Sequence, residues 1–139
     1  MIILDTNVVS ALMRDQPDTQ IIGWLDNLPV FSIWITSITV MEIEFGLETI
    51  PLGRRRQAMK KLFQEVLDRK IEDRIAPFDM AAASQAALLM ASRKQKGRPQ
   101  EFRDTMIAGI VLASHASLAT RNTSHFEDIS ASVINPWAL

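Results

Sequence analysis

Short apolar segments alternate with longer amphipathic segments along the whole of this chain, and this alternation narrows the possible folds more than any other feature. Short runs of apolar and β-branched residues predict strands, whereas apolar residues that recur at helical spacing predict helices. Predicted strands occupy residues 1–4, 30–35, 74–76, 117–119 and 131–134. Strands separated by helices favour an α/β domain with a mostly parallel sheet.

Proline, glycine and capping residues delimit the predicted helices. These helices occupy residues 7–12, 18–28, 37–49, 54–70, 79–96 and 102–115. Neither an internal repeat nor a low-complexity linker interrupts the pattern. A chain of 139 residues is large enough to bury one hydrophobic core, so residues 1–139 are expected to form a single domain.

The first predicted strand ends at a carboxylate. Asp5 follows the apolar residues 1–4 and precedes Thr6 and Asn7. In an open α/β sheet, functional sites are built at the carboxyl ends of the strands. Aspartate is also a good helix cap, and taken alone Asp5 is better explained as the cap of the helix that follows.

A second carboxylate lies on the helix predicted at residues 37–49. There Ile38, Met41 and Phe45 are expected to share an apolar face, and Glu42 borders that face. Glu42 is therefore poorly placed for a purely solvent-exposed role. Glu44, on the same helix, is better explained as an exposed residue, although the sequence leaves an exchange of roles between the two glutamates open.

A third carboxylate, Asp104, lies in the first turn of an otherwise apolar helix, where an acidic residue also complements the helix dipole. Asp5, Glu42 and Asp104 could converge at one end of the sheet. Three neighbouring carboxylates repel one another unless a cation neutralises them. The chain has no cysteine, and oxygen ligands suit Mg²⁺ or Mn²⁺, so convergence would imply one of these ions.

The net charge of −1 does not indicate a nucleic-acid partner, so any such indication must come from local clusters of basic residues. Arg98 and Arg103 flank the loop that leads into the third carboxylate and are the better candidates for RNA contacts. The other clustered basic residues are Arg54, Arg55, Arg56, Lys60 and Lys61, which fit a solvated helix surface, and Arg93, Lys94 and Lys96 in the same cluster as Arg98. His115 and His125 are better explained as structural or surface residues than as metal ligands.

No apolar stretch approaches the roughly 20 residues of a membrane-spanning helix, and no basic segment precedes the first apolar run. A cytosolic protein with no membrane segment is the expectation.

Four segments together resemble a known family. These are residues 2–7, the helix with Glu42, residues 103–108 and residues 119–126, and their order and spacing are those of PIN domains. The resemblance spans nearly the whole chain. It is closest to the VapC-type toxin ribonucleases of bacterial toxin–antitoxin pairs, including the FitB-like branch, whose chains also tend to end with a segment like residues 135–137.

The resemblance implies a three-layer α/β/α fold, commonly dimeric, with an acidic site that binds Mg²⁺ or Mn²⁺ and cuts RNA. Asp5, Glu42 and Asp104 would take the principal acidic roles, with Asp5 and Asp104 as the first candidates for direct metal ligands. Thr6 and Thr120 would support them through their hydroxyl groups.

One position departs from the family pattern. Asn122 stands where relatives usually have a fourth aspartate, and an asparagine can orient a water or offer its carbonyl oxygen but adds no negative charge. The number of metal ions is therefore open. Asp128 could substitute if the loop folds back, although its position fits a surface turn equally well.

The resemblance also implies an antitoxin partner that wraps an apolar groove. Residues 81–91 and 38–47 are candidate surfaces for this partner, and both could instead be core or homodimer interface. The competing function is a catalytically weakened PIN-like module that acts through binding alone. A phosphoacceptor domain fits less well, because Thr36 and Ser37 follow the second strand in place of a phosphorylatable aspartate, and Asn7 replaces the second aspartate of haloacid-dehalogenase-type phosphatases.

Overall fold

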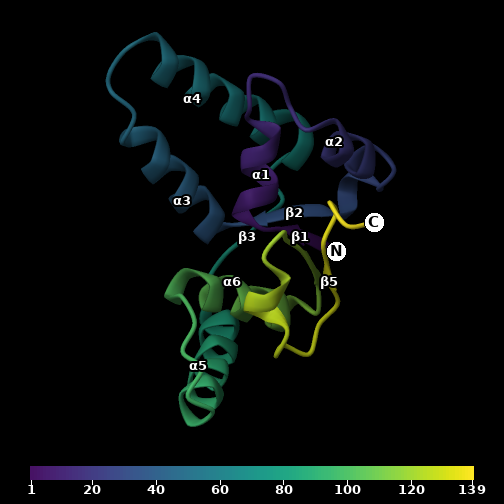
Figure 1. Cartoon of the computed structure of the whole chain (residues 1–139), viewed down its shortest axis with the longest axis vertical. Coiled ribbons are helices and arrows are strands. Elements are labelled where there is room, and N and C mark those ends of the chain that lie inside the picture. Colours follow the sequence, from purple (N-terminus) through teal and green to yellow (C-terminus); the bar gives the residue numbers. More distant parts are fainter.

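A five-stranded parallel sheet divides the molecule into two helical layers (Figure 1). The computed structural model describes all residues from 1 to 139. The strand order is β3-β2-β1-β4-β5, which places β1 at the centre. The strands are β1 (Ile2–Leu4), β2 (Ile33–Thr36), β3 (Ile75–Ala76), β4 (Ser117–Ala119) and β5 (Val133–Ile134).

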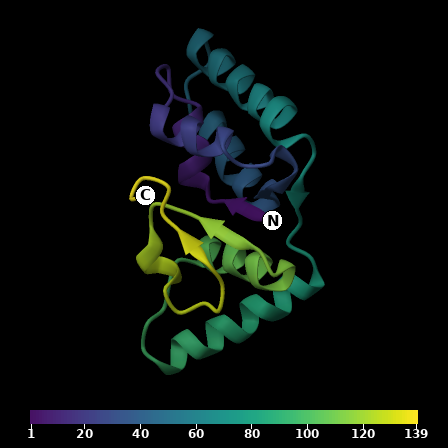
Figure 2. The ribbon, with the colours of Figure 1, turned by 90° about the vertical axis from the view of Figure 1, so that its right-hand side faces the viewer.

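The helices cover both faces of this sheet (Figure 2). One layer contains α1 (Thr6–Leu12), α2 (Thr19–Asp26), α3 (Ser37–Glu48) and α4 (Arg54–Val66), and the other contains α5 (Met80–Gln95) and α6 (Phe102–Ser114). The predicted three-layer α/β/α architecture is thus confirmed. None of the helices combines the length and apolar character that a bilayer crossing requires.

Side-chain alternation in the strands builds one hydrophobic core on each face. Successive side chains of a strand point to opposite faces, and in β1 Leu4 belongs to the core under α1 to α4 while Ile3 belongs to the core under α5 and α6. Both residues are fully buried. The register pairs Leu4 with Ala119, so the residues that follow β1 and β4 emerge side by side at one edge.

Two predicted elements differ from the structure by three or more residues at one end, and the other bounds differ by at most two residues. The strand predicted at residues 30–35 begins only at Ile33, because Val30–Ser32 form the single 3₁₀ turn η1. Both the backbone N–H and the hydroxyl of Ser32 donate to the carbonyl of Pro29, which closes this turn. The helix predicted at 54–70 is interrupted after Val66, where the π-helical turn η2 (Leu67–Ile71) follows.

The two helices of the second layer pack in close contact at Gly109 of α6. A Cβ atom at this position would lie 2.5 Å from the carbonyl oxygen of Ala82 and 2.9 Å from the Cβ of Ala86, both on α5. We expect Gly109→Ala to destabilise the fold by about 1–3 kcal/mol through overpacking, which outweighs the helix-propensity gain of about 1 kcal/mol. Urea unfolding measures this difference.

Gly23→Ala is the matched control for this substitution. Gly23 also lies inside a helix, α2, but a Cβ atom there would meet no atom within 4 Å. Only the propensity gain applies, so Gly23→Ala should raise the free energy of unfolding. Equal effects of the two substitutions would contradict the close packing of α5 against α6.

Candidate active site

Asp5 occupies the C-terminal end of the central strand and caps α1. Its side chain is 2% exposed and accepts hydrogen bonds from the backbone N–H of Thr6 at 2.8 Å and from the hydroxyl of Thr120 at 2.7 Å. Burial raises the pKa of the Asp5 carboxyl, and the negative charge of Asp104 raises it further, against the lowering effect of these hydrogen bonds. Asp5 therefore caps α1 and also lies at the carboxyl edge of the sheet, where the site is predicted.

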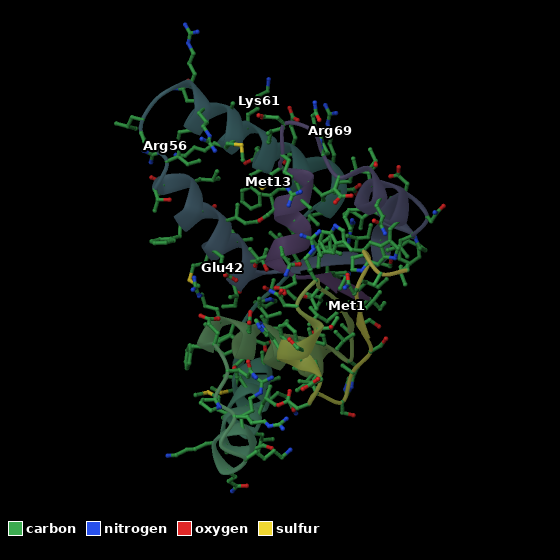
Figure 3. All side chains as sticks on the ribbon, viewed as in Figure 1. Met1, Met13, Glu42, Arg56, Lys61 and Arg69 are labelled. Atoms are coloured by element: carbon green, nitrogen blue, oxygen red, sulfur yellow. The ribbon has the colours of Figure 1, made fainter.

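Glu42 faces Asp5 from the neighbouring helix α3. Figure 3 shows it on the part of α3 nearest the α6 layer. One of its carboxylate oxygens accepts a hydrogen bond from the Thr6 hydroxyl at 2.9 Å, and this hydroxyl also lies 3.0 Å from that of Thr39. Desolvation raises the pKa of Glu42, and the charges of Asp5 and Asp104 add to the rise. Thr6 thus links the cap of α1 to the Glu42 side chain.

The predicted apolar face of α3 is partly wrong. Ile38 is buried, but Met41 is 47% exposed and Phe45 is 66% exposed. The helix instead buries Ile43 and Leu47 in the first core, whereas Ile38 packs in the second core. Glu42 still borders buried surface, because α3 passes the edge of the sheet where the two cores approach each other. Glu44, the alternative to Glu42, is exposed.

Asp104 lies in the first turn of α6, but it is not the helix cap. That role belongs to Glu101, whose carboxylate accepts from the backbone N–H of Asp104 at 3.0 Å. The Asp104 side chain is therefore available for other contacts. One of its oxygens lies 2.9 Å from Nδ1 of His125.

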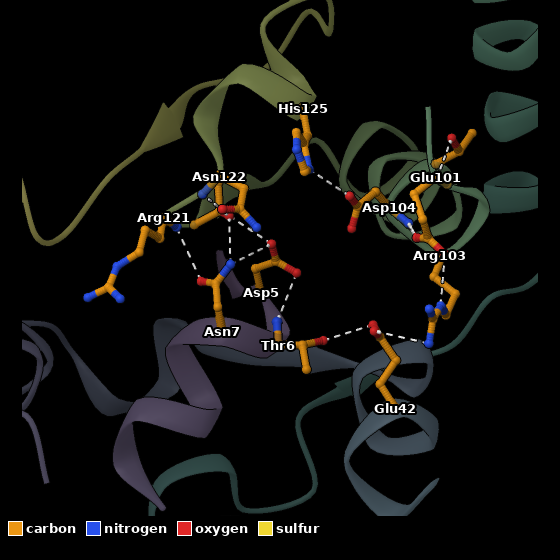
Figure 4. A network of polar contacts seen from close by, with 12 residues as sticks. Asp5, Thr6, Asn7, Glu42, Glu101, Arg103, Asp104, Arg121, Asn122 and His125 are labelled. Carbon is orange, nitrogen blue, oxygen red and sulfur yellow. Dashed lines mark hydrogen bonds and ion pairs between the residues drawn. The ribbon is translucent and has the colours of Figure 1, made fainter. Parts of the chain in front are cut away.

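The three acidic side chains come from separate elements and face one common space (Figure 4). Besides burial, neighbouring charges raise the pKa of two of them: the charge of Asp104 acts on Asp5, and the charges of Asp5 and Asp104 act on Glu42. No three Asp, Glu or His side chains lie at the spacing of a preformed metal site. The donor set is nevertheless one that hard divalent cations prefer, since all three groups are carboxylates and a cation would relieve their mutual repulsion. The residues therefore fit Mg²⁺ or Mn²⁺ by their chemistry.

Asn122 lies beside this group at the start of the turn after β4 (Figure 4). Its backbone N–H donates to the Thr120 hydroxyl at 3.0 Å, and the same hydroxyl donates to Asp5. Thr120 therefore joins the two strand ends, in the supporting position predicted for it. The Asn122 side chain is exposed.

The structure does not bring Asp128 to the site. Both oxygens of this carboxylate accept hydrogen bonds from the guanidinium of Arg93, at 2.8 and 2.9 Å, and this contact lowers the pKa of Asp128. Of the two alternatives for Asp128, the structure therefore favours the surface turn over a place in the acidic group. Arg93 belongs to the basic cluster considered for RNA contacts, but it is only 2% exposed. It therefore cannot contact a phosphate backbone.

Sequence reasoning missed two residues of the site, Asn7 and His125. Asn7 donates to the Thr120 hydroxyl at 3.3 Å and accepts from the backbone N–H of Arg121 at 3.2 Å, so it ties α1 to the turn after β4. His125 contacts Asp104 although it was expected to be structural or a surface residue. Both follow a parallel strand within a few residues, and that position at the carboxyl edge was the available signal.

The cations around the site differ in their partners. Arg103 lies 2.9 Å from a carboxylate oxygen of Glu101 and 3.8 Å from one of Glu42, so it partly neutralises the acidic group. Arg98 is exposed in the loop before α6. Arg121 stacks over Trp137, with its guanidinium carbon 3.8 Å from the ring centroid. All three lie on or beside loops that lead to the acidic residues.

The two surfaces predicted for an antitoxin have different environments. On α5, the small residues Ala82 and Ala86 are buried against α6, so this face belongs to the core. On α3, Met41 and Phe45 remain exposed. The α3 surface therefore keeps apolar side chains available for a protein partner. Away from its alanine face, α5 also keeps Leu88 and Met90 exposed.

Comparisons with known proteins identify the family of this chain. A model of the PIN domain family matches residues 2–131. The chain is 36% identical to the VapC ribonuclease Y4jK of Sinorhizobium fredii over 137 residues, covering 99% of this chain and 98% of that protein. It is 31% identical to the toxin FitB of Neisseria gonorrhoeae over 137 residues, with 99% of each chain covered.

Solved structures extend the similarity to the complete fold. In the crystal structure of FitAcB from Neisseria gonorrhoeae, a chain with 32% identity matches 100% of both chains with a TM-score of 0.85. In the structure of FitAB bound to a DNA fragment called IR36, a chain with 31% identity matches with a TM-score of 0.90, covering 100% of this chain and 97% of that one. The chain therefore belongs to the PIN domain family, and its relatives include a VapC ribonuclease and the toxin FitB.

Proposed function

We propose that this protein is the toxin of a type II toxin–antitoxin pair and that it hydrolyses RNA phosphodiester bonds with a bound Mg²⁺ or Mn²⁺. The observation that carries the proposal is the convergence of Asp5, Glu42 and Asp104 at the carboxyl edge of the sheet. Relatives that match nearly the full chain are named as ribonucleases, which supports the same chemistry.

In this proposal Asp5 and Asp104 are the direct ligands, and Glu42 either joins them or accepts a proton from the attacking water. When bound, the ion would lower the pKa of a water and stabilise the charge that develops on the phosphate. Thr120 and the Thr6 backbone hold Asp5, while the Thr6 hydroxyl orients Glu42. The raised pKa of Glu42 suits a proton acceptor, since a base is most effective near the working pH.

Asn122 would add an oxygen ligand or orient a water without adding charge. Its place beside Asp5 and Thr120 suits a site with one strongly held ion rather than two. The same substitution favours the alternative function, a weakened PIN-like module that binds RNA or protein without cutting. The two functions differ in whether the purified protein binds a divalent cation and cleaves RNA.

Arg98, Arg103 and Arg121 are the proposed contacts to the RNA backbone. Arg103 and Arg121 lie near the acidic group (Figure 4), and Arg98 is exposed in the loop before α6. Single-stranded or loop RNA is the expected substrate by resemblance to the family. No side-chain arrangement that would read a particular base is evident. Cleavage specificity is therefore not part of the proposal.

The proposed partners are a cognate antitoxin and a second copy of the chain. The toxin FitB is among the relatives, and related chains occur in the structures called FitAcB and FitAB. Exposed Met41 and Phe45 on α3 give this chain an apolar surface close to Glu42. An antitoxin seated there could reach the acidic residues with a basic side chain.

Cleavage of end-labelled RNA by the purified protein tests the proposal. We expect cleavage with Mg²⁺ or Mn²⁺ and none with EDTA, because the carboxylates alone supply no positive charge to the phosphate. The Asp104→Ala protein, purified in parallel, excludes a contaminating nuclease. Absence of cleavage across varied RNAs, together with absence of Mn²⁺ binding in calorimetry, would replace the proposal by the binding-module alternative.

A further inference from the structure

Arg93, near the C-terminal end of α5, is a fully buried cation that lies behind the acidic group. Its guanidinium donates to the Thr105 hydroxyl at 2.9 Å, to the backbone carbonyl of His125 at 3.0 Å, and to both carboxylate oxygens of Asp128. Only 2% of the residue is exposed. One side chain therefore joins α5 to the start of α6 and to the turn η3 (Thr123–Phe126).

The start of α6 and the η3 turn, which Arg93 joins, each contribute one residue to the contact between Asp104 and His125. Thr105 directly follows Asp104 on α6, and the Thr105 hydroxyl also donates to the Glu101 carbonyl at 3.2 Å. The His125 carbonyl accepts from Arg93, while the His125 ring nitrogen lies 2.9 Å from the Asp104 carboxylate. Arg93 thus holds the two sides of the His125–Asp104 contact through one rigid planar group.

Stability alone is a weak reason to bury this cation. Arg93 is buried, whereas 30% of the side chain of its partner Asp128 is exposed. Burying a cation costs desolvation free energy that its attraction to a carboxylate often fails to recover. The planar guanidinium does offer a geometry that lysine lacks, because it can donate to several fixed acceptors at once. The arrangement is therefore suited to fixing relative positions.

We propose that Arg93 is a positioning residue for the metal site. It sets the η3 turn against α6 so that His125 holds the Asp104 carboxylate in one orientation, although Arg93 itself touches no acidic residue of the site. This inference rests on the proposed function, since it assigns Asp104 to a bound Mg²⁺ or Mn²⁺. Loss of a partner that orients a metal ligand typically weakens metal affinity by about 10–100-fold.

Isothermal titration calorimetry with Mn²⁺, in the absence of RNA, tests the proposal. We expect Arg93→Lys to weaken Mn²⁺ affinity about 10-fold, because lysine keeps the charge but cannot reach all three acceptors. His125→Ala should weaken it to a similar degree, and the double variant should be no weaker than His125→Ala alone. His125→Asn should restore part of the affinity, since an amide can still reach Asp104.

Arg74→Lys is the matched control. Arg74 is also a partly buried arginine that donates to two backbone carbonyls, those of Ile33 and Lys70, at 2.8 Å each. These acceptors are not part of the acidic group, so this variant should lower the melting temperature without changing Mn²⁺ affinity. His125 is 42% exposed on its side chain, so His125→Ala should fold even if Arg93→Lys does not.

These measurements distinguish a failure of the positioning role of Arg93 from a failure of the proposed function. If Arg93→Lys and His125→Ala melt earlier but bind Mn²⁺ as tightly as the unmodified protein, the positioning role is overturned and Arg93 is only structural. If the unmodified protein binds no Mn²⁺, the proposed function fails and this inference fails with it. Additive losses in the double variant would show that Arg93 does not act through His125.

Discussion

Asp104→Asn is expected to reduce RNA cleavage by about 10³-fold or more while the protein remains folded. Asparagine keeps the size of the side chain but removes the negative charge that would hold a divalent cation. The helix start is preserved, because Glu101 and not Asp104 accepts from the first free N–H groups of α6. A gel assay with end-labelled RNA and Mn²⁺ measures the loss, and circular dichroism verifies the fold.

The control for Asp104→Asn is Asp68→Asn. Asp68 is an exposed carboxylate on η2 whose side chain accepts from Gln64 at 2.9 Å, with no link to the acidic group. The two substitutions change the net charge equally, so a general electrostatic effect on RNA binding would appear in both. Retention of metal-dependent cleavage by Asp104→Asn would remove Asp104 from the proposed ligands.

Much of the site could be predicted because local sequence signals and sheet geometry point to the same edge. Asp5 ends an apolar strand, and Glu42 and Asp104 lie on helices whose other residues are largely apolar. Parallel strands with helical connections bring their carboxyl ends together, so residues far apart in the chain become neighbours. The contact between Asp5 and Thr120, which are separated by 115 positions, follows from this rule and from the pairing of β1 with β4.

The missed features depend on tertiary contacts that leave no local pattern. The ion pair between Arg93 and Asp128 joins residues 35 positions apart, and each residue alone resembles an ordinary surface charge. The prediction of the apolar face of α3 was partly wrong because this helix contributes residues to both cores. Its apolar residues therefore do not form the single stripe that helical periodicity predicts. His125 was missed because a lone histidine in a loop has no distinctive spacing.

The free energy of unfolding of the metal-free protein should depend on pH through the titration of Asp5. Burial raises the pKa of Asp5 in the folded protein above its ordinary value, so the folded state binds a proton more readily than the unfolded state. The contribution of Asp5 to the free energy of unfolding is therefore most favourable at low pH. It declines as the pH rises from the ordinary aspartate value through the raised pKa, and it stays constant above that. Glu42, whose pKa is also raised, adds a decline of the same sign.

Asp5→Asn should remove the decline in stability that the titration of Asp5 causes, and it should abolish RNA cleavage. Urea denaturation in EDTA measures the free energy of unfolding of both proteins. From acidic to neutral pH, the stability of Asp5→Asn relative to the unmodified protein should increase. A pH-independent difference would contradict the assignment of a raised pKa to Asp5. Comparing the two proteins at each pH cancels the titration of every other group that the substitution leaves unchanged.

Added Mn²⁺ should stabilise the two proteins unequally at neutral pH. A ligand that binds only the folded state stabilises it by about 2.7 kcal/mol at 100 times its dissociation constant, and the buried carboxylate of Asp5 is the group whose charge such an ion would compensate. The unmodified protein should therefore gain stability with Mn²⁺, whereas Asp5→Asn should gain little. The charge that strains the metal-free fold would then be the one that binds the ion, and an equal gain in both proteins would place the Mn²⁺ site away from Asp5.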